Sequence, residues 1–164
     1  GAGMRLWVAL VALVALAAGG QAPLQRRVVK EALEYFHGRS NVRFLFRERA
    51  VEAAVEREDA SGTFVQLRLS LAQTTCRKRA PPRQNCRVVE NPRQPTCLAC
   101  YKFDRSDVPK VLDKYHNCGP SHHLAAKEIR QRDEAECRAV EEAGTGTDAL
   151  YLPGMFAFSK GLPA

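Results

Sequence analysis

Val65-Gln-Leu-Arg-Leu-Ser-Leu71 is the clearest strand pattern in the sequence. Single polar residues separate its four apolar side chains, and a period of two places those side chains on one face of a β-strand. One face is therefore predicted to lie against a core and the other against solvent. Ser61-Gly62 precedes the pattern and predicts a turn into it.

A helix and another strand are predicted on the N-terminal side. Pro23 suits the first turn of a helix and Gly38 suits its end. Between them the apolar side chains recur at helical spacing, at Leu24, Val28, Ala32, Leu33 and Phe36. Val42, Phe44 and Phe46 then alternate with arginines, and the alternation extends toward Val55. This order predicts a helix followed by an antiparallel hairpin.

The C-terminal half is less regular. Residues 87–89 and 98–103 are shorter strand candidates, and the proline-containing stretch from Pro81 to Pro95 predicts the loop between them. Residues 124–140 are interpreted as a short helix followed by a strand at 137–140. A helix first and antiparallel strands afterwards predict an α+β fold.

Six cysteines occur in the chain: Cys76, Cys86, Cys97, Cys100, Cys118 and Cys137. An even number in a small exported domain predicts three disulfides, with about fifteen possible pairings. Zinc is the alternative, because Cys97 and Cys100 with His116 and Cys118, or with His122, have acceptable ligand spacing. The residues alone leave the pairing open.

The net charge of +7 is concentrated in one region. The basic residues are Arg77, Lys78, Arg79, Arg83, Arg87 and Arg93, opposed there only by Glu90. Such a patch suits sulfated glycans or anionic bacterial membranes, while the alternative is a solvated loop. No aromatic residues are interleaved with these bases, so no nucleic-acid partner is expected.

The N-terminal segment predicts export. Arg5 precedes an apolar run over residues 6–18, and small residues follow it, as in a secretory signal peptide cleaved within residues 19–22. A retained membrane anchor is the alternative, although the run is short for a membrane span. Gly1, Ala2 and Gly3 precede Met4 and are treated as a remnant outside the fold. We therefore expect a signal peptide over 1–20 and one domain over 21–142.

The C-terminal segment carries apolar residues around a Pro-Gly turn, in Tyr151-Leu-Pro-Gly-Met-Phe-Ala-Phe-Ser159. Residues 143–149 predict a mobile linker. The candidate receptor-binding residues are Tyr151, Leu152, Pro153, Gly154, Phe156, Ala157, Phe158 and Ser159. Cleavage between Ser159 and Lys160 would remove residues 160–164 and create a new carboxylate. The alternative is that Phe156 and Phe158 fold back onto the domain.

Several motifs together resemble the chemerin family, within the wider cystatin and cathelicidin superfamily. They are Glu34-Tyr-Phe-His37, Gln73-Thr-Thr-Cys-Arg-Lys-Arg79, Cys97-Leu-Ala-Cys100 and the segment over 151–160. The resemblance implies a cystatin-like domain with disulfides Cys76–Cys86, Cys97–Cys118 and Cys100–Cys137. Leu152 stands where the family usually has Phe and Met155 where it often has Gln, so we expect a changed receptor affinity.

The resemblance also implies a function. Members are secreted chemoattractants and adipokines, made as weakly active precursors that serine proteases and carboxypeptidases trim at the C-terminus. The trimmed form activates chemerin-type G-protein-coupled receptors, which direct leukocyte migration and inflammation and influence adipocyte differentiation and insulin sensitivity. We expect a monomer with no cofactor and no metal.

Two other functions are alternatives to this one. A cystatin-type inhibitor of cysteine proteases needs a Gln-x-Val-x-Gly loop, and the charged stretch over 55–62 lacks it. A cathelicidin-like antimicrobial precursor would release a cationic peptide, whereas this tail is nearly neutral. No nucleophile motif accompanies the four histidines, so an enzyme is not predicted.

Overall fold

The helix predicted near the N-terminus is present as α2 (Pro23–His37). The computed structural model describes residues 22–79, 81, 85–90 and 94–145. Pro23 occupies the first turn, where its missing N–H leaves no unpaired donor. Gly38 caps the other end through its N–H, which donates to the Glu34 carbonyl at 3.0 Å. The buried face of α2 consists of Val28, Val29, Ala32 and Phe36.

Four strands follow and pair antiparallel in sequence order, so that each strand lies beside its neighbour in the chain. They are β1 (Phe44–Asp59), β2 (Gly62–Arg77), β3 (Pro95–Phe103) and β4 (Val111–Pro120). The predicted turn at Ser61-Gly62 joins the two longest strands. The expected α+β fold, with an N-terminal helix packed on an antiparallel sheet, is confirmed.

The alternation predicted for β2 is confirmed. Val65, Leu67, Leu69 and Leu71 are completely buried, and they form one core with α2 and with alternate residues of β3. Burying each such side chain contributes roughly 1.5–3 kcal/mol. This α2-side core is the larger of the two cores and fixes the register of the sheet, since a slip of one residue would expose the whole row.

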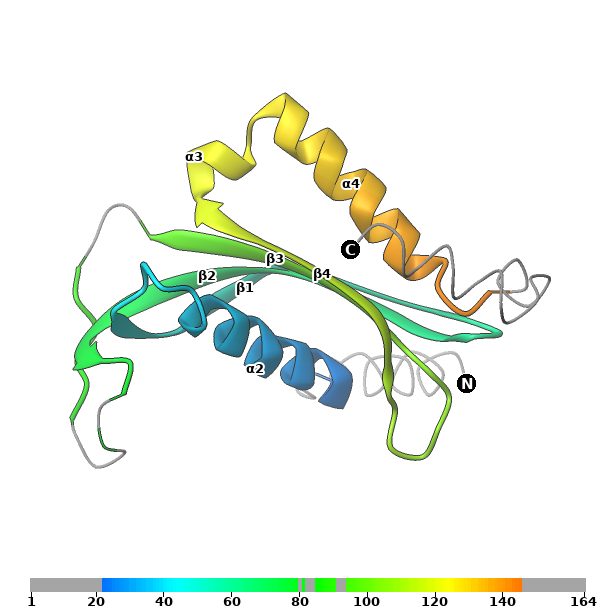
Figure 1. Cartoon of the computed structure of the whole chain (residues 1–164), viewed down its shortest axis with the longest axis horizontal. Coiled ribbons are helices and arrows are strands. Elements are labelled where there is room, and N and C mark those ends of the chain that lie inside the picture. The colour runs from blue at the N-terminus through cyan, green and yellow to red at the C-terminus, as the bar shows by residue number, and fades with distance from the viewer. Residues whose placement is uncertain (1–21, 80, 82–84, 91–93, 146–164) are drawn as a thin grey trace, which may run out of the picture.

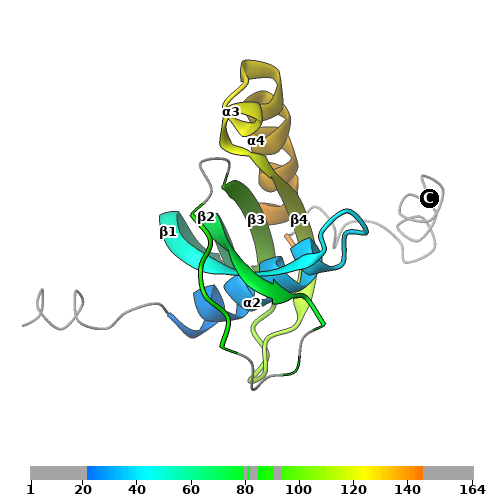
Figure 2. The ribbon, with the colours of Figure 1, turned by 90° about the vertical axis from the view of Figure 1, so that its left-hand side faces the viewer.

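A second helix covers the opposite face of the sheet (Figure 1). It is α4 (Lys127–Glu141), preceded by the short α3 (Ser121–Leu124). The view turned by 90° shows α4 on one side of the strands and α2 on the other (Figure 2). A smaller core of Phe64, Leu98, Cys100, Cys137 and Val140 lies between α4 and the sheet. Because β3 lies between the two helices, its residues from Thr96 to Phe103 are all buried.

The strand predicted at residues 137–140 is wrong, because these residues form the last turn of α4. Asp133, Cys137 and Val140 are the buried residues of this helix and recur at helical spacing. The Asp interrupted the apolar stripe in the sequence. It is buried because its carboxylate accepts hydrogen bonds from the Tyr115 hydroxyl at 2.8 Å and the Asn117 amide at 2.9 Å.

Two other strand predictions need correction. Residues 87–89 contribute only an isolated bridge, from Val88 to Thr74. Strand β4 was not predicted, and it is an edge strand in which no side chain is fully buried. Its apolar alternation is therefore weak, and the strand is held by pairing with β3 from Pro95↔Pro120 to Phe103↔Val111.

All six cysteines form disulfides: Cys76–Cys86, Cys97–Cys118 and Cys100–Cys137. These are the pairings that the family resemblance implied. The first closes the loop after β2, the second joins β3 to β4, and the third joins β3 to α4. The zinc alternative is therefore wrong for these cysteines, because the thiols it requires are consumed by the second and third bridges. No helix in the described ranges is long and apolar enough to span a membrane.

Candidate functional site

The predicted receptor-binding and processing residues, 151–160, lie outside the residues that the structure describes. The nearest described part is the segment from Glu141 to Thr145, here called the tail root. It leaves α4 in a turn in which the Ala143 N–H donates to the Val140 carbonyl at 3.1 Å and the Thr145 N–H to the Glu142 carbonyl at 3.2 Å. The tail root is the described segment that directly precedes the predicted tail in the chain.

A completely buried lysine holds the tail root against the sheet. The Nζ atom of Lys102, on β3, donates to the Glu141 carbonyl, one of the unpaired carbonyls at the end of α4. The same Nζ contacts the Asp59 carboxylate at 2.8 Å, at the end of β1. One ammonium group therefore joins the helix end, the sheet and the β1–β2 turn.

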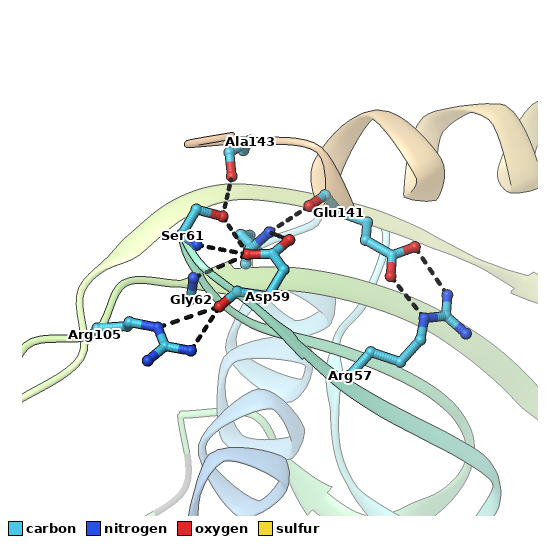
Figure 3. Close-up of polar contacts among 8 residues, drawn as sticks. Arg57, Asp59, Ser61, Gly62, Arg105, Glu141 and Ala143 are labelled. Carbon is cyan, nitrogen blue, oxygen red and sulfur yellow. Dashed lines mark hydrogen bonds and ion pairs between the residues drawn. The ribbon is translucent and has the colours of Figure 1, made fainter. Parts of the chain in front are cut away.

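The β1–β2 turn is built around Asp59. Its Oδ1 accepts hydrogen bonds from the backbone N–H groups of Ser61 at 2.8 Å and Gly62 at 3.1 Å. The Ser61 hydroxyl lies between Asp59 Oδ1 and the Ala143 carbonyl, 3.3 Å from the latter (Figure 3). Gly62 is required by space, because an added Cβ would lie 1.8 Å from the Phe103 carbonyl oxygen. The turn thus contacts the tail root directly.

The charges of this cluster are matched. Hydrogen bonds from Lys102 and from Ser61 hold the pKa of the Asp59 carboxyl well below its usual range. Arg57 donates to both carboxylate oxygens of Glu141, at 2.6 and 2.9 Å, and lowers the pKa of that carboxyl. Both ion pairs formed between described residues, Arg57–Glu141 and Lys102–Asp59, lie here. The tail root is therefore fixed in position by paired charge.

The predicted basic patch lies at the other end of the sheet, where β2 finishes. Arg77, Arg79 and Arg87 are exposed, while Arg83 and Arg93 lie outside the described residues. The loop carrying Arg87 lies along β2, because the Thr75 N–H donates to the Arg87 carbonyl at 2.8 Å. Residues 85–90 are thereby brought beside the end of the strand.

Lys78 does not belong to this exposed patch, contrary to prediction. Its Nζ donates to the carbonyls of His37 at 2.9 Å and Arg39 at 3.1 Å, just beyond the end of α2. Burial and the nearby Lys78 charge lower the pKa of His37, whose Nε2 accepts the Phe46 N–H at 2.9 Å. Lys78 therefore joins the end of α2 to the sheet.

Arg47 is a member of the patch that sequence reasoning missed. It lies on β1, and its guanidinium donates to the Cys86 carbonyl at 3.3 Å. The available signal was the alternation of Arg43 and Arg47 with apolar residues, which placed them on a solvated face. We call the exposed set Arg47, Arg77, Arg79 and Arg87 the basic end.

Comparison with known proteins identifies relatives of the chain. No protein-family model matches it. It is 41% identical over 139 residues to retinoic acid receptor responder protein 2 of Homo sapiens, covering 85% of this chain and 83% of that protein. The protein of the same name from Bos taurus is 38% identical, over 84% of this chain and 83% of its own length. The one from Mus musculus is 35% identical, over 84% and 82%.

The chain belongs to the chemerin family, whose members are named retinoic acid receptor responder protein 2. Among solved structures, Al-CPI is similar with a TM-score of 0.44 and 22% identity, over 59% of this chain and 92% of that one. Dimeric human cystatin F is similar with a TM-score of 0.42 and 20% identity, over 62% and 84%.

The β1–β2 hairpin of this chemerin-family chain contacts helix α4. The stretch over 55–62, where a cystatin would need its inhibitory loop, forms the β1–β2 turn and its approach. Arg57 and Asp59 in this stretch contact Glu141 and Lys102. The turn is therefore engaged with the chain's own helix α4. Among the described residues no group of three His, Cys, Asp or Glu side chains is placed to hold a metal ion.

Proposed function

We propose that the chain is a secreted chemoattractant and adipokine precursor, and that trimming after Ser159 allows its tail to activate a chemerin-type G-protein-coupled receptor. The observation that carries this proposal is membership of the chemerin family over about 85% of the chain. Three disulfides support export, because such bridges persist in oxidising compartments. In this proposal the chain acts as a ligand rather than as an enzyme.

In this proposal the domain holds the start of the tail in place, and the tail contacts the receptor. Lys102 and Arg57 hold Glu141 against the sheet, so the tail starts from a fixed point. Only three residues lie between Glu141 and Thr145, the last described position. From there the segment to Ser159 reaches up to about 45 Å when extended, which suits insertion into a receptor away from the domain.

Trimming is proposed to act through charge and bulk. Burying Tyr151, Leu152, Phe156 and Phe158 contributes roughly 6–12 kcal/mol before the cost of ordering the segment is subtracted. Nanomolar binding requires about 12 kcal/mol net, so apolar burial alone falls short. A free carboxylate at Ser159 paired with a receptor cation adds to the affinity, and Pro153-Gly154 presets a turn and reduces the ordering cost.

The test compares four ligands on receptor-expressing cells. These are the chain ending at Ala164, the chain ending at Ser159, the peptide over 151–159 and the same peptide with an amidated end. We expect the chain ending at Ser159 to be far more potent than the full chain, the peptide to signal alone, and amidation to weaken it. Equal potency of the two chains would end the trimming proposal. If the peptide is inert at micromolar dose while the trimmed chain is active, the domain makes the receptor contact instead of the tail.

A second proposal concerns the basic end. We infer that it binds sulfated glycans or anionic bacterial surfaces, which would retain or concentrate the protein. The supporting observation is that Arg77, Arg79 and Arg87 are exposed and have no ion pair with any described residue. Retention of the protein on immobilised heparin, eluted by salt, tests it. Loss of retention in the triple variant R77Q/R79Q/R87Q is the expected result.

A further inference from the structure

A hollow of about 390 Å³ lies on the α4 side of the sheet, at the same end as α3. Its lining includes Arg68 of β2, Arg130 of α4 and Glu52 of β1, together with Thr96, Ser121 and Leu124. Figure 1 shows α3 and the start of α4 rising at the end of the sheet opposite the tail root. The hollow is therefore remote from the tail root.

Two guanidinium groups line this hollow without an acidic partner. Arg68 is half-buried in the middle of β2, and neither its guanidinium nor that of Arg130 has a hydrogen bond or ion pair with any residue in the described part of the chain. Two like charges on the wall of one hollow repel each other, and an anion bound between them relieves this repulsion. With Glu52 as the single carboxylate of the lining, the hollow keeps a net positive charge.

The hollow and part of the basic end lie along one face of β2. Between Arg68 and Ala72 the extra residues of the pairing are in β1, so β2 alternates regularly there and Arg68 and Ala72 point to the same face. Arg47 lies opposite Ala72 and reaches the carbonyl of Cys86, next to Arg87. Arg68 and Ala72 are four residues, or about 13 Å, apart along the strand. Cations thus follow one line from the hollow to the loop.

We propose that this hollow is the end subsite of a sulfated-glycan site, binding one sulfate between Arg68 and Arg130 while the chain continues over Arg47 to Arg87. This inference rests on the second proposal above and adds the part of the molecule that the sequence patch did not contain. A sulfate oxygen accepts several N–H donors at once, which matches two guanidinium groups. The hydroxyls of Thr96 and Ser121 are hydrogen-bonded to each other at 2.8 Å, which leaves one hydroxyl hydrogen as a further donor on the wall.

The recessed position favours a chain-like anion over a membrane. Arg68 is half-buried between the helix and the strands, where a thin flexible glycan can place a sulfate. A flat bilayer surface would instead contact the protruding loop that carries Arg79 and Arg87. The length of β2 over which the cations are spread also suits an extended polymer better than a single small ion.

The experiment measures the affinity of the full secreted chain for a size-defined heparin octasaccharide by calorimetry. The double variant R68Q/R130Q is expected to bind about tenfold more weakly or worse, because two charge-assisted contacts are lost. R138Q is the matched control, since Arg138 is exposed on α4 and outside the lining. It is expected to change the affinity by less than about threefold. E52Q should tighten binding, because it removes the competing carboxylate.

The possible outcomes distinguish glycan binding in the hollow from glycan binding at the basic end alone. If R68Q/R130Q binds within about threefold of R138Q while R79Q/R87Q loses binding, the hollow is excluded and the basic end stands. If neither set of variants matters, both proposals fail. Loss of binding to phosphatidylglycerol vesicles, but not to the octasaccharide, in R68Q/R130Q would also overturn the inference. Should R68Q prevent folding, R130Q and E52Q alone decide it, since both positions are exposed.

Discussion

At the tail root the charged side chains are paired with one another, whereas at the basic end exposed arginines have no acidic partner among the described residues. Lys102 and Arg57 neutralise Asp59 and Glu141 at the first end. Strand β2 connects the two ends over 16 residues, up to about 50 Å. Paired charge holds backbone in place, while unpaired charge remains available to a partner. The two ends therefore suit the two proposed functions, presenting a tail and retaining the protein.

The largest expected effect comes from the disulfide that ties α4 to the sheet. Replacing Cys100 and Cys137 with serine opens a loop of 37 residues, and the chain-entropy model predicts a loss of roughly 4 kcal/mol in the free energy of unfolding. Hydrogen exchange should rise most in α4 and the tail root. The control C76S/C86S opens a loop of 10 residues, with a smaller loss of roughly 3 kcal/mol. Hydrogen exchange in this control should rise most at the basic end. If the two variants showed the same exchange pattern, the tail root and the basic end would not be stabilised independently.

The next effect is steric and concerns the turn beside the tail root. In Gly62→Ala the new Cβ would meet the Phe103 carbonyl oxygen at 1.8 Å, so the turn or β3 must move. We expect the free energy of unfolding to fall by about 3 kcal/mol, measured by urea denaturation. Gly119→Ala is the control, because the nearest atom to its added Cβ is 3.7 Å away. A Gly62→Ala loss no larger than that of Gly119→Ala would show that the turn is not close-packed.

A smaller effect is expected from removing the buried cation. Lys102→Met keeps most of the apolar stem but leaves the Glu141 carbonyl without its donor. We expect a loss of about 2 kcal/mol, moderated because the Asp59 side chain is 41% exposed and can be rehydrated. Protease sensitivity between Glu141 and Thr145 should rise with it. Lys114→Met on β4 serves as the control, and unchanged cleavage in Lys102→Met would remove the anchoring role.

The paired charge should also make stability depend on pH. The pKa of Asp59 is lowered in the folded state, so the unfolded state binds more protons as the pH falls below about 4. Stability from this group is therefore present above the unfolded pKa and is lost under acid conditions. The difference in unfolding free energy between the unchanged chain and Asp59→Asn should shrink from pH 5 to pH 2. His116 affects stability at higher pH, because burial lowers its pKa to about 4 from the ordinary value of about 6.5. Because His116 is present in both the unchanged chain and Asp59→Asn, its contribution cancels in the difference between their unfolding free energies.

The smallest effect is expected at the basic end. Arg79→Gln with Arg87→Gln should change the free energy of unfolding by less than about 0.5 kcal/mol, because both residues are exposed. Arg57→Gln is the counterpart at the tail root. Its ion pair with Glu141 is partly exposed, so a loss of up to about 1 kcal/mol is expected. Thermal unfolding of the two variants measures this contrast, and a larger loss at the basic end would reverse it.

Much of the fold followed from local patterns. The α2 helix was predicted from its proline, its glycine and its apolar spacing, and β2 from strict alternation. The β4 strand could not be predicted, since an edge strand buries too little apolar surface to leave a period. The end of α4 was misread because a buried Asp133 occupies its apolar stripe, and its partners Tyr115 and Asn117 come from a strand that was itself missed.

For the site, the sequence identified Arg77, Arg79 and Arg87 of the basic end, and it could not tell paired charges from free ones. Lys78 was counted as a surface cation although it binds the end of α2. Arg47 was not counted, because it comes beside the loop only when the sheet forms. Arg68 was not counted, because it lines the hollow only when α3 and α4 pack beside the strands. The aromatic tail itself lies beyond the described residues, and its role remains a proposal.

The sequence by itself determined helix α2, strands β1, β2 and β3, the number of cysteines available for bridges and the excess of positive charge, because these depend on spacing and composition along the chain. Tertiary structure alone decided that Lys102 is buried beneath the tail root and that Arg68 and Arg130 share one hollow. Each of these pairings joins residues from different elements. Which charges meet a partner is set by how the strands and helices pack, and no local pattern records it.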